Sequence, residues 1–163
     1  MLSFFKNLFG GSKKSCCGTG CCSSAPADHA KLLGFNETDV ASVKKLPASL
    51  VVGKVLTKED HPNEKMTKVK VASVDLGNGK IETICCGGTN LEAGQIVAVA
   101  TVGTMLPGDF EIGERDLRGV MSRGMICARK ELDISCEDEG PKEIWALPAH
   151  YEKHVGSSLA ELV

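Results

Sequence analysis

The spacing of hydrophobic residues changes about a third of the way along the chain. In the first part, Val40, Val43 and Leu46 recur at helical intervals. Apolar residues three or four positions apart form one face of a helix, and Asn36 or Thr38 provides an N-cap. This stretch therefore predicts a short helix that packs on whatever follows it.

Short β-branched runs bounded by turn residues replace the helical pattern from Leu50 onward, and they predict strands. Between the second and third runs, Gly77-Asn78-Gly79 favours the positive φ angles of a tight hairpin, so those two strands are expected to be antiparallel neighbours. Four or five short strands with glycine-rich connections predict a mainly β, five-stranded OB-fold barrel. The predicted strands are Leu50–Thr57, Val69–Val74, Ile81–Cys86 and Ile96–Val102.

Lysines alternate with valines at the start of the second predicted strand. Side chains alternate between the faces of a strand, so Val69 and Val71 are expected to point inward and Lys68 and Lys70 outward. Lys65 precedes them in the loop. This cationic stripe suits a nucleic-acid backbone, and a solvated lysine face is the alternative.

Composition and charge narrow the class of protein. With 25% charged and 42% hydrophobic residues, the chain has the composition of a globular protein. The longest uncharged apolar run, Ile96–Leu106, is shorter than the ~20 residues that span a bilayer, so no membrane partner is expected. The net charge of −2 combines an acidic end, with two Lys or Arg against eight acids after residue 130, with a slightly cationic remainder. Any RNA-binding surface must therefore be local.

Aromatic residues are scarce in the predicted barrel. The chain has five Phe, one Trp and one Tyr, and four of the Phe precede the first predicted strand, which leaves Phe110 in the barrel. Recognition of single strands by a series of stacked bases is therefore disfavoured, and recognition of folded RNA by shape and backbone is the expected mode.

Four cysteines lie close together near the N-terminus. Thiolates suit zinc, Cu(I) or an iron–sulfur cluster, so Cys16, Cys17, Cys21 and Cys22 are candidate metal ligands, although adjacent cysteines do not easily converge on one ion. A flexible Gly/Ser-rich tail with incidental thiols and no cofactor is the alternative. Without a recognisable secretory signal, we expect a reducing, cytoplasmic location.

Several motifs together resemble one family. They are His61-Pro-Asn63, the segment Val102–Phe110 with its Leu-Pro-Gly-Asp-Phe sequence, Leu117–Leu132, Ile144–Pro148 and Val155-Gly156. In order and spacing they resemble the tRNA-binding OB-fold family. They are most similar to the N-terminal tRNA-binding module of bacterial phenylalanyl-tRNA synthetase β subunits and its free-standing relatives.

The resemblance implies further site residues. The Arg-Gly-x-x-Ser-x-Gly-Met segment is where the family places Ser and Met near tRNA, and Ile84–Asn90 resembles its Cys-Gly-x-x-Asn turn. His61 and Asn63 have edges that suit phosphate or ribose, and a purely structural turn is the alternative. With the three lysines, the predicted RNA-binding residues are His61, Asn63, Lys65, Lys68, Lys70, Asn90, Arg118, Ser122, Arg123 and Met125.

These features predict a tRNA-binding module without catalysis of its own. Residues 1–27 are expected to form a disordered Cys-rich tail, 28–46 a short helical segment and 47–163 the OB-fold domain with a C-terminal extension. The expected partner is tRNA, and a synthetase subunit and a second copy of the chain are further candidates. A synthetase-docking module and a metal or redox protein that uses the N-terminal cysteines remain the alternatives.

Overall fold

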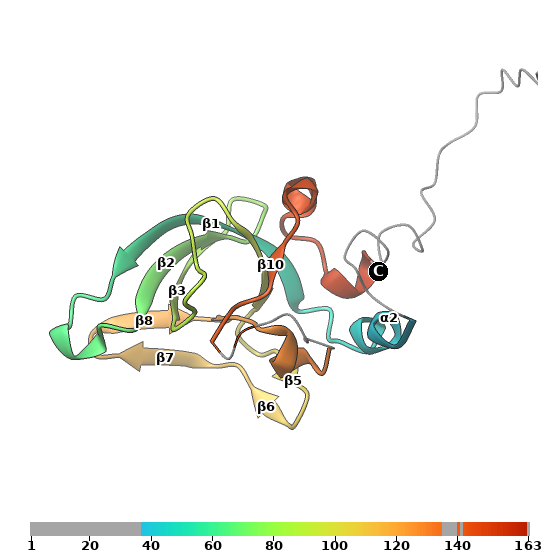
Figure 1. The fold of residues 1–163 in the computed structure, drawn as a ribbon, viewed down its shortest axis with the longest axis horizontal. Helices are drawn as coiled ribbons and strands as arrows, with labels where there is room; N and C mark the ends of the chain where they lie inside the picture. Colours follow the sequence, from blue (N-terminus) through green and yellow to red (C-terminus); the bar gives the residue numbers. More distant parts are fainter. Residues whose placement is uncertain (1–36, 135–139, 141, 163) are drawn as a thin grey trace, which may run out of the picture.

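The computed structural model describes residues 37–134, 140 and 142–162, and its longest strand, β1, organises the fold. The first half of β1 pairs with β4 and the second half with β2, both antiparallel. The sheet runs in the order β10-β4-β1-β2-β3, with β9 also paired to β4 (Figure 1). The strands of this sheet are β1 (Leu50–Asp60), β2 (Lys70–Asp75), β3 (Ile81–Cys86), β4 (Ile96–Ala100), β9 (Met125–Ile126) and β10 (Ala146–Leu147).

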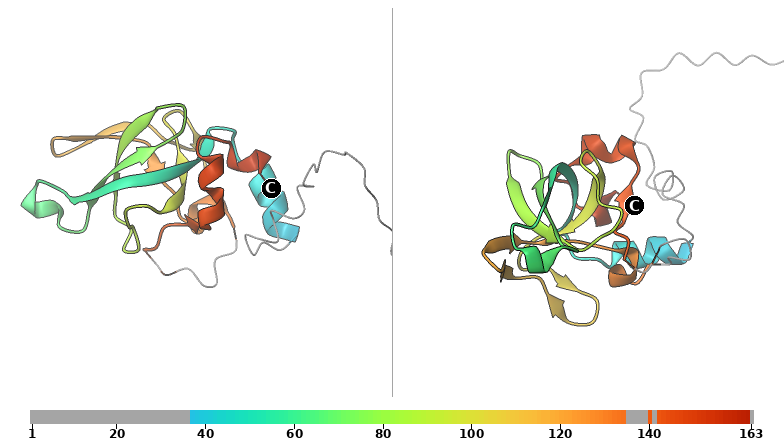
Figure 2. Two further views of the ribbon diagram at one scale, coloured as in Figure 1. Left: turned by 90° about the horizontal axis from the view of Figure 1, so that it is seen from above. Right: turned by 60° about the vertical axis from the view of Figure 1, so that its left-hand side comes forward.

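The sheet curls into a nearly closed, five-stranded antiparallel barrel (Figure 2). The register of β1 shifts between Val55 and Thr57, and such an irregularity bends a strand. Gly53 permits close packing on the inside of the bend, because a Cβ there would lie 2.7 Å from Val99 Cγ2. One strand can therefore serve both halves of the barrel.

Short elements surround the barrel. Among the described residues, one helix precedes it, two small hairpins lie between β4 and β9, and 3₁₀ turns lie in the loops and near the C-terminus. The helices are α2 (Glu37–Lys44), η1 (Glu64–Met66), η2 (Arg129–Leu132), η3 (Ala149–His154) and η4 (Leu159–Glu161), and the hairpins are β5–β6 (Met105–Leu106, Phe110–Glu111) and β7–β8 (Glu114–Leu117, Val120–Arg123).

Strand β4 separates two hydrophobic clusters. All five of its residues are buried, which explains its uninterrupted apolar sequence. Val97 and Val99 belong to the cluster inside the barrel, whereas Ile96, Ala98 and Ala100 belong to the cluster against α2 and the C-terminal segment. Because apolar area is buried on both of its faces, β4 contributes strongly to the free energy of folding.

The C-terminal segment packs on the start of β1. Val52 N donates to Ser157 O at 3.0 Å, Gly156 N donates to Val52 O at 2.8 Å, and Val51 forms an isolated bridge with Ser158. Buried Leu159 lies in the same cluster as α2. The segments that precede and follow the barrel in sequence therefore share one hydrophobic core with it.

Most sequence-based expectations of the fold are confirmed. The four predicted strands are present within a few residues of their expected ends, and the helix over Val43 packs on the barrel. Gly77, Asn78 and Gly79 all have positive φ and join antiparallel β2 and β3. The part of the expected helical segment before residue 37 and the Cys-rich tail lie outside the described residues.

One expectation was wrong, the direction of the side chains on β2. Ala72 and Val74 are the fully buried residues of β2, so Lys70, two positions earlier, is in phase with the core face, and Val71 is on the other side and half-buried. The short valine–lysine alternation straddles the beginning of the strand, and barrel packing sets the phase.

No helix among the described residues is long and apolar enough to cross a membrane.

Candidate nucleic-acid interface

Four lysines from three segments line one open cavity of about 510 Å³. We call it the lysine cavity. Lys58 comes from the second half of β1, Lys68 and Lys70 from the junction of the preceding loop with β2, and Lys142 from the segment before β10. Its floor contains the glycine pair after β3 and apolar side chains, and the remaining lining residues are Val69, Gly87, Gly88, Thr89 and Leu91.

Hydrogen bonds between two loops bring Lys142 to the cavity. Thr89 N donates to Lys142 O at 3.0 Å. Asn90 binds the backbone of Ile144 at both ends of its amide: Nδ2 donates to Ile144 O at 3.0 Å, and Oδ1 accepts from Ile144 N at 2.8 Å. The predicted RNA-binding residue Asn90 therefore holds the strand that leads to β10, and its contact with RNA stays a prediction.

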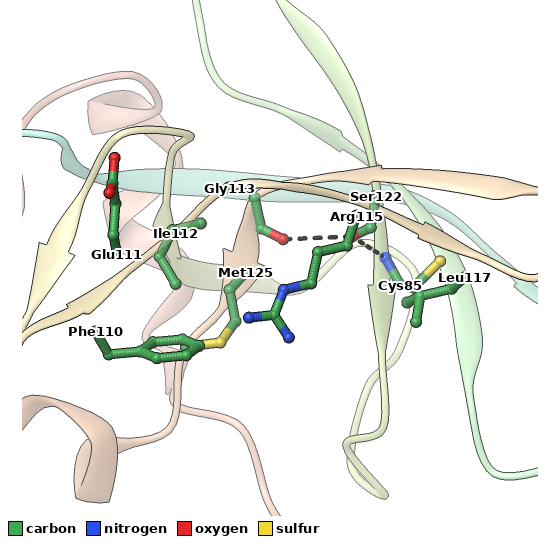
Figure 3. Close-up of a pocket in the computed structure, with 10 residues that line it drawn as sticks. Cys85, Phe110, Glu111, Ile112, Gly113, Arg115, Leu117, Ser122 and Met125 are labelled. Atoms are coloured by element: carbon green, nitrogen blue, oxygen red, sulfur yellow. Dashed lines mark hydrogen bonds between the residues drawn. The ribbon is translucent and has the colours of Figure 1, made fainter.

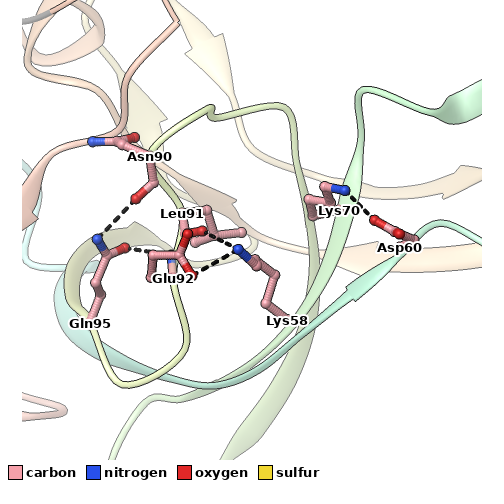
Figure 4. Close-up of polar contacts among 7 residues, drawn as sticks. All are labelled: Lys58, Asp60, Lys70, Asn90, Leu91, Glu92 and Gln95. Atoms are coloured by element: carbon pink, nitrogen blue, oxygen red, sulfur yellow. Dashed lines mark hydrogen bonds and ion pairs between the residues drawn. The ribbon is translucent and has the colours of Figure 1, made fainter.

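Two of the four lysines have acidic partners (Figure 4). Lys58 Nζ lies 2.8 Å from Glu92 Oε2 and 3.0 Å from Leu91 O. Lys70 pairs with Asp60, and this contact holds the pKa of the exposed Asp60 carboxyl below its usual value.

The other two lysines of the cavity have no such partner. Lys68 and Lys142 are exposed and form no ion pair with any described residue. Their charge is therefore available to an anionic ligand without the loss of a salt bridge.

His61 joins the loop after β1 to the β7–β8 hairpin. The ring is only 7% exposed. Its Nδ1 accepts from Asn63 N at 3.1 Å, so Nε2 carries the proton and donates to Leu117 O at 2.8 Å. Asn63 Oδ1 in turn accepts from Lys65 N and caps η1. Both ring nitrogens thus bind backbone groups, as expected for a structural turn. Contact of His61 or Asn63 with RNA stays a prediction.

Arg118 occupies an unusual position at the tip of the β7–β8 hairpin. It forms a two-residue turn with Gly119, and both residues have positive φ, 52° and 97°, as a type I′ turn requires. Asp116 Oδ1 accepts from Gly119 N at 2.7 Å and supports the turn. Asn or Gly is favoured at such a φ, so an exposed arginine there is a conformational cost without a packing benefit.

Ser122 and Arg123 hold β8 against β3. Ser122 is 5% exposed, and its Oγ accepts from Cys85 N at 3.0 Å. Arg123 points outward, where its Nε lies 3.3 Å from Glu114 Oε1 and its guanidinium 3.9 Å from Glu82 Oε2. The structure therefore separates these two predicted residues onto opposite faces of β8.

A second cavity, of about 170 Å³, lies between the two small hairpins (Figure 3). Phe110, Ile112, Leu117 and the predicted residue Met125 provide its apolar walls. The Arg115 guanidinium lies over the Phe110 ring, 5.5 Å from its centroid. We call this space the Phe110 cavity.

Sequence reasoning missed several residues of these two cavities. Lys58 and Lys142 reach the lysine cavity only through long-range pairing, and Arg115 and Phe110 meet across two hairpins. Phe110 is noticeable in the sequence as the one phenylalanine of the predicted barrel, but its neighbours in the cavity are not.

The described cysteines are protonated at neutral pH. Burial raises the pKa of the Cys127 thiol to about 12, and burial also raises the pKa values of Cys85 and Cys86. No group of three or more His, Cys, Asp or Glu side chains among the described residues is arranged to hold a metal ion. The candidate ligands Cys16, Cys17, Cys21 and Cys22 lie outside the described residues, and their metal site stays a prediction.

Known proteins provide an independent comparison. The chain is 39% identical over 122 residues to the phenylalanine–tRNA ligase β subunit of Acinetobacter baylyi. The aligned region covers 75% of this chain and 15% of that subunit. It is 41% identical over 113 residues to the corresponding subunit of Aliivibrio fischeri, and this aligned region covers 69% of this chain and 14% of that subunit. The chain thus spans about one seventh of the curated relatives it matches.

A family model completes the assignment, and one solved structure is reported beside it. A solved structure of a MetRS-related protein from Pyrococcus horikoshii is similar with a TM-score of 0.45 and 22% identity, covering 67% of this chain and 86% of that chain. The family model described as a putative tRNA-binding domain matches residues 50–154. The resemblance inferred from the motifs is therefore confirmed, and the chain belongs to the putative tRNA-binding domain family.

Proposed function

We propose that this chain is a cytoplasmic tRNA-binding module that recognises the folded shape and phosphate backbone of tRNA and has no catalysis of its own. The lysine cavity is the observation that carries the proposal. Lys68 and Lys142 offer two positive charges beside the glycine backbone of residues 87–88. A Cβ at Gly87 would meet nothing within 4 Å, so the fold leaves open space there for a close approach of a sugar–phosphate chain.

The hairpin tip adds a third cationic group next to this surface. The hydrogen bond from His61 to Leu117 O fixes the β7–β8 hairpin beside the η1 loop, which precedes Lys68 (Figure 1). Arg118 follows Leu117 at the tip of this hairpin, and Lys65 belongs to η1. Cationic groups on more than one loop can contact phosphates of a folded RNA, which proteins recognise by its shape and backbone.

The absence of catalysis is supported by the chemistry of the described side chains. Ser122 Oγ and both nitrogens of His61 are bonded to backbone groups, and the raised pKa of the Cys127 thiol keeps it uncharged. None of these groups pairs with another as a nucleophile and base within the described part of the chain.

The test is the equilibrium affinity of the full chain for bulk tRNA over a salt series. Each lost phosphate contact should lower the slope of log affinity against log salt by about 0.7–0.9, so Lys68→Ala with Lys142→Ala should lower it by about 1.5. Lys45→Ala is the matched control, because Lys45 is exposed and follows α2, at the other end of the molecule (Figure 1). Equal slopes for wild type and the double variant would refute the lysine cavity as the interface.

A gain-of-binding variant sharpens the test. Asp60→Asn removes the partner of Lys70 and one negative charge at the cavity edge, so tRNA should bind more tightly and with a steeper salt dependence. If the wild-type chain does not bind tRNA at low salt but co-purifies with a synthetase subunit, the function is docking instead.

A further inference from the structure

We propose that the Phe110 cavity accepts one unpaired, pyrimidine-sized base of the bound RNA, stacked on the Phe110 ring. This inference rests on the proposed function and adds a specific contact to it. The lysine cavity explains attraction to any phosphate backbone. The Phe110 cavity would favour an RNA whose fold presents an unstacked base.

The size of the cavity limits the ligand. An apolar cavity of roughly 150 Å³ holds one benzene ring. The Phe110 cavity, at about 170 Å³, therefore fits a single six-membered ring and is too small for a complete nucleotide. The sugar and phosphate would remain outside, at the exposed rim formed by Glu111, Gly113 and Arg115.

The walls have the chemistry of a base-stacking site. Phe110 is 44% exposed although it is a large apolar residue, and it faces the half-buried Met125 side chain across the cavity mouth (Figure 3). Aromatic rings and arginine guanidinium planes are the surfaces on which RNA-binding proteins stack unpaired bases. Ile112 and Leu117 close the apolar sides.

Arg115 marks the position of the base. Its guanidinium lies over the Phe110 ring at 5.5 Å from the centroid, so a planar cation already occupies the face on which a base would stack. An exposed cation–π contact is weaker than base–aromatic stacking, so a base should displace the guanidinium. The freed Arg115, which is exposed, would then lie beside the phosphate of the same nucleotide.

Phe110→Ala in the full chain tests the stacking, with tRNA affinity measured at several salt concentrations. Stacking on an aromatic side chain contributes a factor of about 5 to 150 in affinity and involves no counterion. Phe110→Ala should therefore weaken binding by the same factor at every salt concentration and leave the salt slope unchanged, whereas Phe110→Trp should retain wild-type affinity. Arg115→Gln should instead lower the slope by about 0.7–0.9.

Met105→Ala is the matched control. Met105 lies on the same β5–β6 hairpin and is 49% exposed, but it does not line the Phe110 cavity. Its variant should bind tRNA like the wild type. Equal losses for Met105→Ala and Phe110→Ala would overturn the proposal, because they would indicate a general apolar surface, such as one for a protein partner.

The remaining outcomes separate this inference from the proposed function. Wild-type binding with no effect of Phe110→Ala would overturn the base site alone. If the wild-type chain does not bind tRNA even at low salt, both the base site and the proposed function are overturned. A similar melting temperature for Phe110→Ala and the wild type excludes unfolding as the cause of any loss.

Discussion

Replacing Arg118 by Asn should raise stability and lower tRNA affinity at the same time. The φ of 52° at Arg118 is a left-handed conformation, which costs most L-residues about 1–2 kcal/mol and which Asn adopts more readily. If Asn recovers half of this cost, the gain is about 0.5–1 kcal/mol. For a protein of this size, that corresponds to a rise in Tm of about 1–4 °C.

The loss of affinity follows from the removed charge. One phosphate contact contributes a slope of about 0.7–0.9 in log affinity against log salt, so its removal should weaken binding about fivefold near 0.15 M salt. Calorimetric or circular-dichroism melting measures the first effect, and filter binding with bulk tRNA over a salt series measures the second.

Arg118→Lys separates charge from conformation. Lysine keeps the positive charge and the unfavourable φ, so affinity and Tm should both stay close to those of the wild type. A lower Tm for Arg118→Asn would refute the conformational argument. An unchanged salt slope for Arg118→Asn would show that the hairpin tip does not touch phosphate.

Three further predictions concern the fold. Asn90→Ala leaves the N–H and C=O of Ile144 without their side-chain partner and should lower the unfolding free energy by about 1–3 kcal/mol, measured by urea titration. Gly53→Ala places a Cβ 2.7 Å from Val99 Cγ2 and should destabilise by about 1–3 kcal/mol through overpacking, seen as a lower Tm. Because burial raises the pKa of Cys127 from 9.0 to about 12, the folded state keeps a proton that the unfolded state loses, so stability should fall as the pH rises from 9 to 12. Urea midpoints of wild type and Cys127→Ala across this range should converge.

Local patterns were sufficient for the strands and the hairpin turn. Gly77-Asn78-Gly79 has a conformational preference that needs no tertiary partner, and the apolar run of β4 reflects burial on both faces. The phase of β2 was mispredicted because the four-residue alternation from Lys68 to Val71 straddles the beginning of the strand. The barrel packs Ala72 and Val74 inside, and they are less conspicuous in the sequence than the valines before them.

The candidate site was only partly predictable for a different reason. Motifs identified His61, Asn90 and Ser122, but they could not show that each binds backbone groups from a distant segment. Lys142 reaches the lysine cavity because of such bonds. Which residues meet depends on the closure of the barrel, and that information is spread over the whole chain.

The hydrogen bonds between β1 and the C-terminal segment have a consequence for how the domain is delimited. The family match ends at residue 154, but the groups that satisfy Val52 N and Val52 O belong to Ser157 and Gly156. A chain truncated after His154 would leave this part of β1 as an unpaired edge, which is a template for intermolecular strand addition. Residues 155–159 therefore cover a strand edge that would otherwise favour aggregation, and any excised domain should include them.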